Sequence, residues 1–337
     1  MKSNDTITLA HGSGGRLMHE LVEGLIARVL SNPVLDELDD AADVSGLVEP
    51  GRLAVTTDSF VVQPLFFPGG DIGTLAVAGT VNDLAVKGAR PVALTLGLIV
   101  EEGLAVSDLE RALRSVAETA KTAGVVVTAG DTKVVERGCL GGLVLNTAGL
   151  GFIPEGVELG AARVRDGDAV VISGTVGDHE TAILVAREGF EIDETIESDC
   201  APLHEIAATI LTAAPGARAM RDPTRGGLAT TLNELSARSG VGIEIEEAAV
   251  PVRREVRSVT DILGFDPLFM ANEGKVVAVV PADEAERVVE ALRTHDLGRD
   301  AAVIGRAGGP PGVTLRTRVG GARPLLMLEG VQLPRIC

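Results

Sequence analysis

The sequence predicts an α+β protein made of two globular halves and a tail. Strand-like and helix-like segments mix irregularly and lack the strict βαβ repeat of a doubly wound sheet. The composition changes after residue 153, where the chain enters a stretch of proline, glycine and charged residues. A length of 337 residues is enough for two domains with apolar cores. We expect domains at 1–153 and 154–318, followed by a mobile tail at 319–337.

Three helices and four strands are expected in the first half. The opening helix carries an apolar residue at every fourth position, namely Leu17, Leu21, Leu25 and Val29. The second helix is rich in small residues, and Asp71 is a good candidate for its N-cap. The helices should span residues 15–30, 69–89 and 107–124. The strands should span residues 52–62, 91–100, 125–133 and 141–153.

The second half should also mix both kinds of element. Helices are expected around residues 178–188, 200–213 and 226–239. Short apolar runs predict strands at 169–174, 242–247, 275–280, 301–305 and 313–317. The last residues contain Gly320, Gly321, Pro324 and Pro334, a spacing that suits an arm better than a packed helix.

The charge balance limits the kinds of partner. With 48 acidic and 30 basic side chains the formal charge is −18, which repels nucleic acid and anionic lipid, and no basic run offsets it. The first residues lack the apolar core of a signal peptide, and no later stretch has 18 uninterrupted apolar residues. We therefore expect a cytoplasmic protein with no nucleic-acid or membrane partner.

Acidic residues at the ends of predicted elements suggest a metal site. Asn82 and Asp83 share one face of the second helix, where an unpaired buried carboxylate would cost several kcal/mol. Asp58 and Asp131 lie where apolar strands give way to polar residues. A structural, hydrogen-bonded aspartate remains the alternative for each. Taken together, the three acids favour Mg²⁺, which binds carboxylates and phosphates and so implies a polyphosphate substrate.

A second candidate anion site precedes the predicted helix at 226–239. Asp222, Thr224, Arg225 and Gly226 lie just before its first turn, whose free N–H groups can bind an anion. The same string is also an ordinary helix entry with a threonine cap. Four cations are available to offset the acidic field around a nucleotide: Lys87, Lys133, Arg225 and Lys275.

The chain ends on Cys337, which raises a separate question. The thiol is either incidental to a loose tail or a group that an arm carries between sites. Prenylation is excluded, because it requires cysteine four residues from the end. Cys139 and Cys200 are interpreted as structural. The histidines lack zinc-site spacing, and His179, in the string GDHE, is the one that merits a test.

Several strings together resemble one family. AHGSGG, TTDSFVVQPLFFPGGDIGTLAVAGTVNDLAVKGARP, AGDTKVV, SGTVGDHETAI, RDPTRGGLATTLNE, ANEGK and the final PRIC look like the HypE carbamoyl dehydratases of NiFe hydrogenase maturation. The likeness runs from end to end. Glu180 is a departure, because glycine is expected after GDH.

The resemblance implies a PurM-like fold and a specific reaction. Cys337 would receive a carbamoyl group from a HypF-like carbamoyltransferase, and ATP would then dehydrate the S-carboxamide to an S-cyanate. A HypC–HypD-like complex would accept the cyanide. The first domain would bind ATP and pair in a homodimer.

The resemblance also implies roles for individual residues. Lys133 and Glu273 are candidates for proton transfer, as base and relay. The magnesium ligands would be Asp58, Asp83 and Asp222. Contacts to the nucleotide are expected from Asp58, Asn82, Asp83, Asp131, Thr224, Arg225 and Gly226.

Two other functions remain open at this point. A PurM-like synthetase or kinase acting on a free small molecule would leave Cys337 incidental. A non-enzymatic thiol scaffold would only dock partners.

Overall fold

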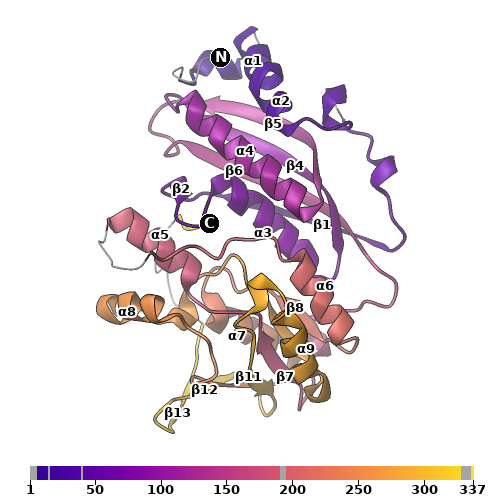
Figure 1. The fold of residues 1–337 in the computed structure, drawn as a ribbon, viewed down its shortest axis with the longest axis vertical. Helices are drawn as coiled ribbons and strands as arrows, with labels where there is room; N and C mark the ends of the chain where they lie inside the picture. The colour runs from indigo at the N-terminus through magenta and orange to yellow at the C-terminus, as the bar shows by residue number, and fades with distance from the viewer. Residues whose placement is uncertain (1–5, 14–15, 39–40, 190–194, 328–334) are drawn as a thin grey trace.

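The structure, a computed structural model, describes residues 6–13, 16–38, 41–189, 195–327 and 335–337. It has two lobes, each built on one larger sheet (Figure 1). In the first sheet the strand order is β1-β6-β4-β5, with β4 and β5 parallel and the other pairs antiparallel. These strands are β1 (Arg52–Phe60), β4 (Arg90–Glu101), β5 (Val126–Val135) and β6 (Leu143–Ile153).

Helices cover one face of this first sheet. α3 (Ile72–Val86) and α4 (Val106–Ala123) pack together on that face, as Figure 1 shows for α4. Alternate residues of β4, namely Leu94, Leu96, Leu98 and Val100, point into the resulting core and are buried. The smaller elements of this lobe are α1 (Arg16–Leu21), a π-helical turn (Val22–Ala27), α2 (Arg28–Leu30), β2 (Phe66–Phe67) and β3 (Gly70–Asp71).

α3 is the central helix of the molecule. Asp71 caps it as predicted, since its carboxylate accepts hydrogen bonds from the backbone N–H groups of Gly73 and Thr74. Small residues are needed along this helix because its neighbours approach closely. A side chain at Gly73 would collide with the backbone of Ala112 in α4. α3 ends at Val86 and carries Asn82 and Asp83 in its last turns.

The second lobe contains a seven-stranded sheet in the order β13-β12-β9-β11-β7-β10-β8. Its pairs are antiparallel except for β12 and β9, which run parallel. The strands are β7 (Ala169–Ile172), β8 (Ala219–Arg221), β9 (Ile243–Glu246), β10 (Val277–Val280), β11 (Ala302–Ala307), β12 (Val313–Arg316) and β13 (Ala322–Pro324). The helices are α5 (Asp178–Glu188), α6 (His204–Ala213), α7 (Gly227–Ser239), α8 (Arg254–Leu263) and α9 (Ala285–Leu292). The mixed sheets confirm the α+β class.

Parts of the tail predicted at 319–337 contact both lobes in this structure. Residues 322–324 form β13 against β12, and Leu325 is fully buried, because its backbone continues the hydrogen bonding of that edge. At the other end, Ile336 is buried in the core of the first lobe. Figure 1 places the C-terminus beside β2 and α5, between the lobes. The described parts of this segment are therefore docked.

Among the residues that the structure describes, no helix is both long and apolar enough to cross a membrane.

Candidate active site

Three carboxyls, those that the family resemblance implies as metal ligands, act on one another between the lobes. Asp58 comes from β1, Asp83 from the end of α3, and Asp222 from the loop that follows β8. Their charges act on one another: Asp58 raises the pKa of Asp83, and both raise the pKa of Asp222. The chain thus brings together acids that are up to 164 positions apart, between residues 58 and 222.

Burial is the main cause of these shifts. The pKa of Asp83 is raised because its carboxyl is withdrawn from water, and a hydrogen bond from the Thr56 hydroxyl at 2.7 Å opposes the shift. The pKa of Asp222 is raised to about 7, again first by burial and then by Asp83. The raised pKa values of Asp83 and Asp222 mean that a bound cation would relieve the repulsion between these two carboxyls. Among the described residues, however, no three His, Cys, Asp or Glu side chains are already arranged to hold a metal ion.

Cys337 lies beside this acidic group. The Arg225 Nε donates to the Cys337 sulfur at 3.2 Å, and the Glu273 carboxyl is hydrogen-bonded to the same thiol. Asp58 acts on both Cys337 and Glu273 through its charge. The terminal sulfur, a cation and a buried acid therefore occupy one site. Arg225, which was predicted to contact the nucleotide, instead donates to the sulfur.

The proton affinity of the sulfur and of the acid is high. Burial and then the Glu273 charge raise the pKa of the Cys337 thiol to about 12, although Arg225 opposes the shift. Burial, followed by the charges of Asp222 and Asp199, holds the pKa of Glu273 well above its usual range. At neutral pH the Cys337 thiol is therefore protonated, and Glu273 keeps its proton to a higher pH than an ordinary glutamate does.

The Glu273 side chain packs against α3. It is only 3% exposed, and one carboxyl oxygen lies within 4.0 Å of where a side chain on Gly79 would begin. The other oxygen, Oε1, has no hydrogen-bond partner among the described residues. A buried acceptor without a partner is costly, so this oxygen is available to a ligand.

Asn82 has a different role from the predicted nucleotide contact. Its side chain is 1% exposed, and its amide N–H groups donate to the Ala201 and Glu273 carbonyls at 3.1 and 3.2 Å. Its amide oxygen accepts the Leu203 N–H at 2.7 Å. Because the protein itself uses these groups, Asn82 joins the lobes and positions Glu273; the predicted contact is corrected accordingly.

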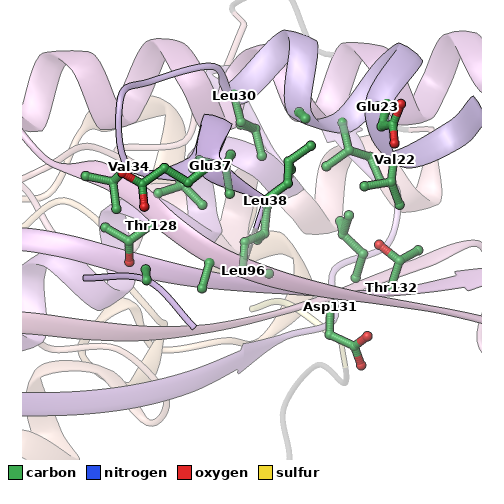
Figure 2. A pocket seen from close by; sticks show the side chains of 18 of the residues that line it. Val22, Glu23, Leu30, Val34, Glu37, Leu38, Leu96, Thr128, Asp131 and Thr132 are labelled. Carbon is green, nitrogen blue, oxygen red and sulfur yellow. The ribbon is translucent and has the colours of Figure 1, made fainter. Parts of the chain in front are cut away.

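Asp131 lies on the other face of the first sheet. Along the ladder Asp131 pairs with Gly97, and Gly97 with Asn146. Asn146 pairs with Ser59, so these positions share one face and Asp58 points to the opposite one. Figure 2 shows Asp131 projecting to the opposite side of β5 from Thr132 and Leu96. The structure therefore does not bring Asp131 to the acidic group.

Lys133 shares the face of Asp131. It pairs with Ile99 of β4, its side chain is 68% exposed, and its Nζ lies 3.9 Å from an Asp131 carboxylate oxygen. Its assignment as a desolvated base beside Cys337 does not fit this place, because the lysine is in water and on the wrong face.

The other predicted ligands have mixed outcomes. Lys275 is 6% exposed, and its Nζ lies 3.2 Å from an Asp199 carboxylate oxygen. The lysine therefore forms an ion pair within the second lobe and is not available to a nucleotide. Thr224 and Gly226 form the turn before α7, and the cap is Gly226 in a left-handed conformation rather than the threonine. This turn carries Arg225 to Cys337.

A cavity of about 480 Å³ opens from Asp83 along the junction of the lobes. Its wall includes three cations, Lys87, Arg221 and Arg238. Another cavity, of about 320 Å³, lies between the N-terminal helices and the first sheet (Figure 2). Leu96 and Thr128 are among its lining residues, while Cys337 and Glu273 are not. The cationic cavity beside Asp83 is the one positioned to serve the acidic group.

The remaining cysteines and Glu180 lie outside this group. Cys200 is buried, as expected for a structural residue. Cys139 is exposed, so it does not have the buried position that its structural assignment requires. Glu180, which departs from the family pattern, is buried and accepts the Ala271 N–H at 2.7 Å. It ties α5 to the loop that leads to Glu273.

Sequence reasoning missed the residues that hold the tail. The Gln63 N–H and the Arg187 guanidinium donate to the Arg335 carbonyl, and His179 contacts the Ile336 carbonyl. No sequence signal links these residues to the last three positions, although the GDHE string did single out His179.

This architecture, with an acidic group between two α+β lobes, is that of the AIR synthase related, PurM-like proteins. The family model for their N-terminal domain matches residues 38–153, and the model for their C-terminal domain matches residues 165–318. The carbamoyl dehydratase HypE of Azotobacter vinelandii is 49% identical over 99% of this chain and 98% of its own length. The chain belongs to the HypE family.

Solved structures support the same placement. A hydrogenase maturation protein HypE in complex with ATP matches with a TM-score of 0.94 and 45% identity, over 98% of this chain and all of the other. A HypE–HypF complex contains a chain that matches with a TM-score of 0.80 and 45% identity, over 91% of this chain and 99% of that one.

Proposed function

We propose that this protein is an ATP-dependent carbamoyl dehydratase whose substrate is its own terminal residue. It converts an S-carboxamide on Cys337 into an S-cyanate, the source of cyanide for the iron centre of NiFe hydrogenases. The observation that carries the proposal is the position of the Cys337 sulfur, which contacts Arg225 and Glu273 and is within reach of the Asp58 charge. A thiol that was incidental to a loose tail would have no reason to be there.

The chemistry can be written with all atoms accounted for. The carboxamide oxygen attacks the γ-phosphorus of ATP, an O–P bond forms, and ADP leaves. The nitrogen then loses its two protons while the C–O bond breaks, giving S–C≡N and phosphate. The amide oxygen thereby departs as phosphate, a far better leaving group. We assign Glu273 as the proton acceptor once it is ionised, and the hydrogen bond between its carboxyl and the sulfur that carries the amide supports this assignment.

The state of the sulfur explains why loading and dehydration are separate steps. A thiol with a pKa of about 12 is a poor nucleophile at neutral pH, so the docked thiol is not the form that accepts a carbamoyl group. Once carbamoylated, the sulfur carries no ionisable proton and enters the buried site without a charge. Loading therefore takes place with the tail outside the cleft, and dehydration with the tail inside it.

ATP binding follows from the cleft and from the ATP complex of a relative. Asp58, Asp83 and Asp222 have the donor chemistry to hold Mg²⁺, and the raised pKa values of Asp83 and Asp222 fit a site that a cation would relieve. The metal would neutralise phosphate charge there. The cavity lined by Lys87 and Arg238 provides room and positive charge beside the carboxylates.

Partners follow from the reaction and from relatives. A HypF-like carbamoyltransferase supplies the carbamoyl group, supported by the HypE–HypF complex of a related chain. A HypC–HypD-like complex takes up the cyanide.

A homodimer through the outer face of the first sheet is part of the proposal. β1 is an edge strand, and its outward residues Leu53 and Val55 are 64% and 71% exposed. Exposed apolar residues on an uncovered sheet face are typical of an interface.

Changing Val55 to Arg should therefore give a monomer of 34.7 kDa, because an uncompensated charge would be buried in the interface. Sedimentation of the wild-type chain should give twice that mass. Val319→Arg, at a 94% exposed position in the other lobe, is the matched control and should remain dimeric. A V55R protein that sediments as a dimer would contradict this interface.

Intact-mass measurement tests the function itself. After incubation with the carbamoyltransferase, carbamoyl phosphate and ATP, Cys337 should first gain a carbamoyl group and then lose the mass of one water. Omission of ATP should stop the reaction at the carbamoylated form. Cys337→Ser should show neither change. ATP-dependent turnover of a free small molecule by the C337S protein would instead favour a diffusible substrate, and the absence of any nucleotide hydrolysis would favour a scaffold.

A further inference from the structure

The last three residues are held by their backbone. The Arg335 carbonyl accepts hydrogen bonds from the Gln63 N–H at 3.2 Å and from the Arg187 guanidinium at 2.8 Å. The Ile336 carbonyl lies 2.8 Å from the His179 Nε2. We call Gln63, His179 and Arg187 the carbonyl clamp. Two successive carbonyls are thus fixed immediately before the residue that carries the sulfur.

The environment of His179 determines where its proton lies. The ring is fully buried, and a carbonyl oxygen can only accept, so Nε2 carries the hydrogen. On the other side, Nδ1 lies 2.8 Å from the Ser198 hydroxyl. That hydroxyl already accepts the Cys200 N–H at 3.1 Å, so its own hydrogen points to Nδ1. The imidazole is therefore neutral, and its Nε2–H points at the tail.

Arg187 extends the clamp from the same helix. His179 and Arg187 are eight positions apart on α5, which is close to two full turns and places both on one face. The guanidinium also donates from Nε and from one terminal nitrogen to the Gln63 carbonyl, at 2.9 and 2.7 Å. It thereby fixes the loop that supplies the Gln63 N–H. The clamp is one connected unit between α5 and the loop after β1.

The tail adopts an uncommon conformation to reach this clamp. Arg335 has φ of +56°, in the left-handed region that L-residues other than glycine rarely occupy. Such a conformation is strained and persists only where the surroundings enforce it. Here the clamp holds its carbonyl, and the buried side chain of Ile336 anchors the next residue. The turn directs Cys337 toward Arg225.

We propose that His179 and Arg187 are positioning residues, which hold the tail so that the Cys337 sulfur enters the dehydration site. The proposal rests on the proposed function for its catalytic consequence. His179 and Arg187 contact only backbone carbonyls of the tail, while the buried Ile336 side chain provides a separate anchor. A carbamoylated tail would be held in the same way, because the modification leaves both carbonyls unchanged.

Thiol labelling tests the clamp without any turnover. The unloaded chain is treated with N-ethylmaleimide at about pH 7.5, a pH far below the raised pKa of the docked thiol, and labelling of Cys337 is followed by peptide mass, with the exposed Cys139 as internal reference. In the wild-type chain Cys337 should react much more slowly than Cys139. His179→Met, which cannot donate, and Arg187→Met should each raise the Cys337 rate at least tenfold. His179→Gln, which restores an N–H donor, should return most of the protection.

Controls separate the clamp from a general loss of structure. Arg299→Met removes an exposed arginine elsewhere and should leave Cys337 labelling unchanged. Each variant is also checked for a cooperative thermal transition. If folded H179M and R187M chains label at the wild-type rate, the clamp proposal is wrong. The R187M variant keeps the test decisive should H179M fail to fold, because Arg187 lies at the surface end of α5.

Turnover then tests the positioning role. With the carbamoylated chain, H179M should lower kcat for cyanate formation at least tenfold, while the KM for ATP stays within about twofold, because the clamp touches the tail and not the nucleotide. H179Q should recover most of kcat. If labelling changes as expected but no chain forms cyanate, the clamp stands and the proposed function fails. If labelling is unchanged in the variants while cyanate forms, the proposed function stands and the clamp proposal fails.

Discussion

Glu273→Gln is expected to lower the rate of S-cyanate formation by about 10² to 10⁴, the range for loss of a general acid–base group. The introduced glutamine would keep the shape of the side chain and fill the same buried space, but it could not take a proton from the amide. Release of phosphate from ATP and the mass loss at Cys337 should fall together, and binding of ATP should be unaffected. Rates measured under single-turnover conditions with the carbamoylated chain give this comparison directly.

The pH profile provides an independent check on Glu273. Its pKa is raised well above the usual range, mainly by burial, so it is protonated and unable to accept a proton until the pH passes that raised value. The rate should therefore climb with pH along a limb lying well above that of an ordinary glutamate. A limb near the ordinary glutamate pKa of about 4.3, or one that persists unchanged in E273Q, would remove Glu273 from the proton transfer.

The same shift affects stability with the opposite sign. A buried acid whose pKa is raised on folding stabilises the protein at low pH and loses that contribution as the pH rises through the raised value. The wild-type chain should thus lose thermal stability relative to E273Q as the pH increases. Parallel melting curves of the two chains at several pH values would reveal it.

Asp83→Asn should reduce ATP turnover by about 10² to 10³, the range for loss of one electrostatic group. The introduced asparagine can still accept the hydrogen bond from Thr56, so the local structure should survive. Without a ligand the variant should be as stable as the wild-type chain or more stable, because it removes a carboxyl from a site where Asp58 and Asp222 repel it.

Added magnesium distinguishes a metal ligand from a structural aspartate. Mg²⁺ with a non-hydrolysable ATP analogue should raise the melting temperature of the wild-type chain and have a much smaller effect on D83N. Asp283→Asn, at an exposed position in the second lobe, is the control and should respond as the wild-type chain does. An undiminished response in D83N would exclude Asp83 as a ligand.

Local patterns predicted much of the fold and the acidic part of the site. Asp71 could be recognised as a cap because capping involves only the next three residues. Asp58 was singled out because it lies where an apolar strand ends, and Asp83 because a carboxylate on an apolar helix needs a partner. Asp222 was assigned as a metal ligand from the family resemblance. These features depend on a few neighbouring positions and can be recognised without the tertiary structure.

The faces of the first sheet could not be predicted in the same way. Asp58 and Asp131 both lie where an apolar run gives way to polar residues, but which face each residue occupies depends on strand register across β1, β6, β4 and β5. A shift of one residue in any pairing reverses the outcome. Lys133 was misplaced beside Cys337 for this reason.

The clamp was out of reach for a different reason. His179 meets Ile336 across 157 positions, and its partner atom is a backbone carbonyl that any residue would supply. No side-chain type at the end of the chain therefore marks the contact. The same applies to Asn82. Its polar side chain suggested a ligand contact, but its amide group is hydrogen-bonded to backbone groups of Ala201 and Leu203 in the second lobe.

The raised pKa of the docked Cys337 thiol also affects how readily this thiol is oxidised. Peroxide attacks thiolates, and with a pKa of about 12 only about one in 10⁵ of the stowed groups is ionised at pH 7. In the docked state the Cys337 sulfur is therefore protected from oxidation, and it becomes reactive only when the tail leaves the cleft.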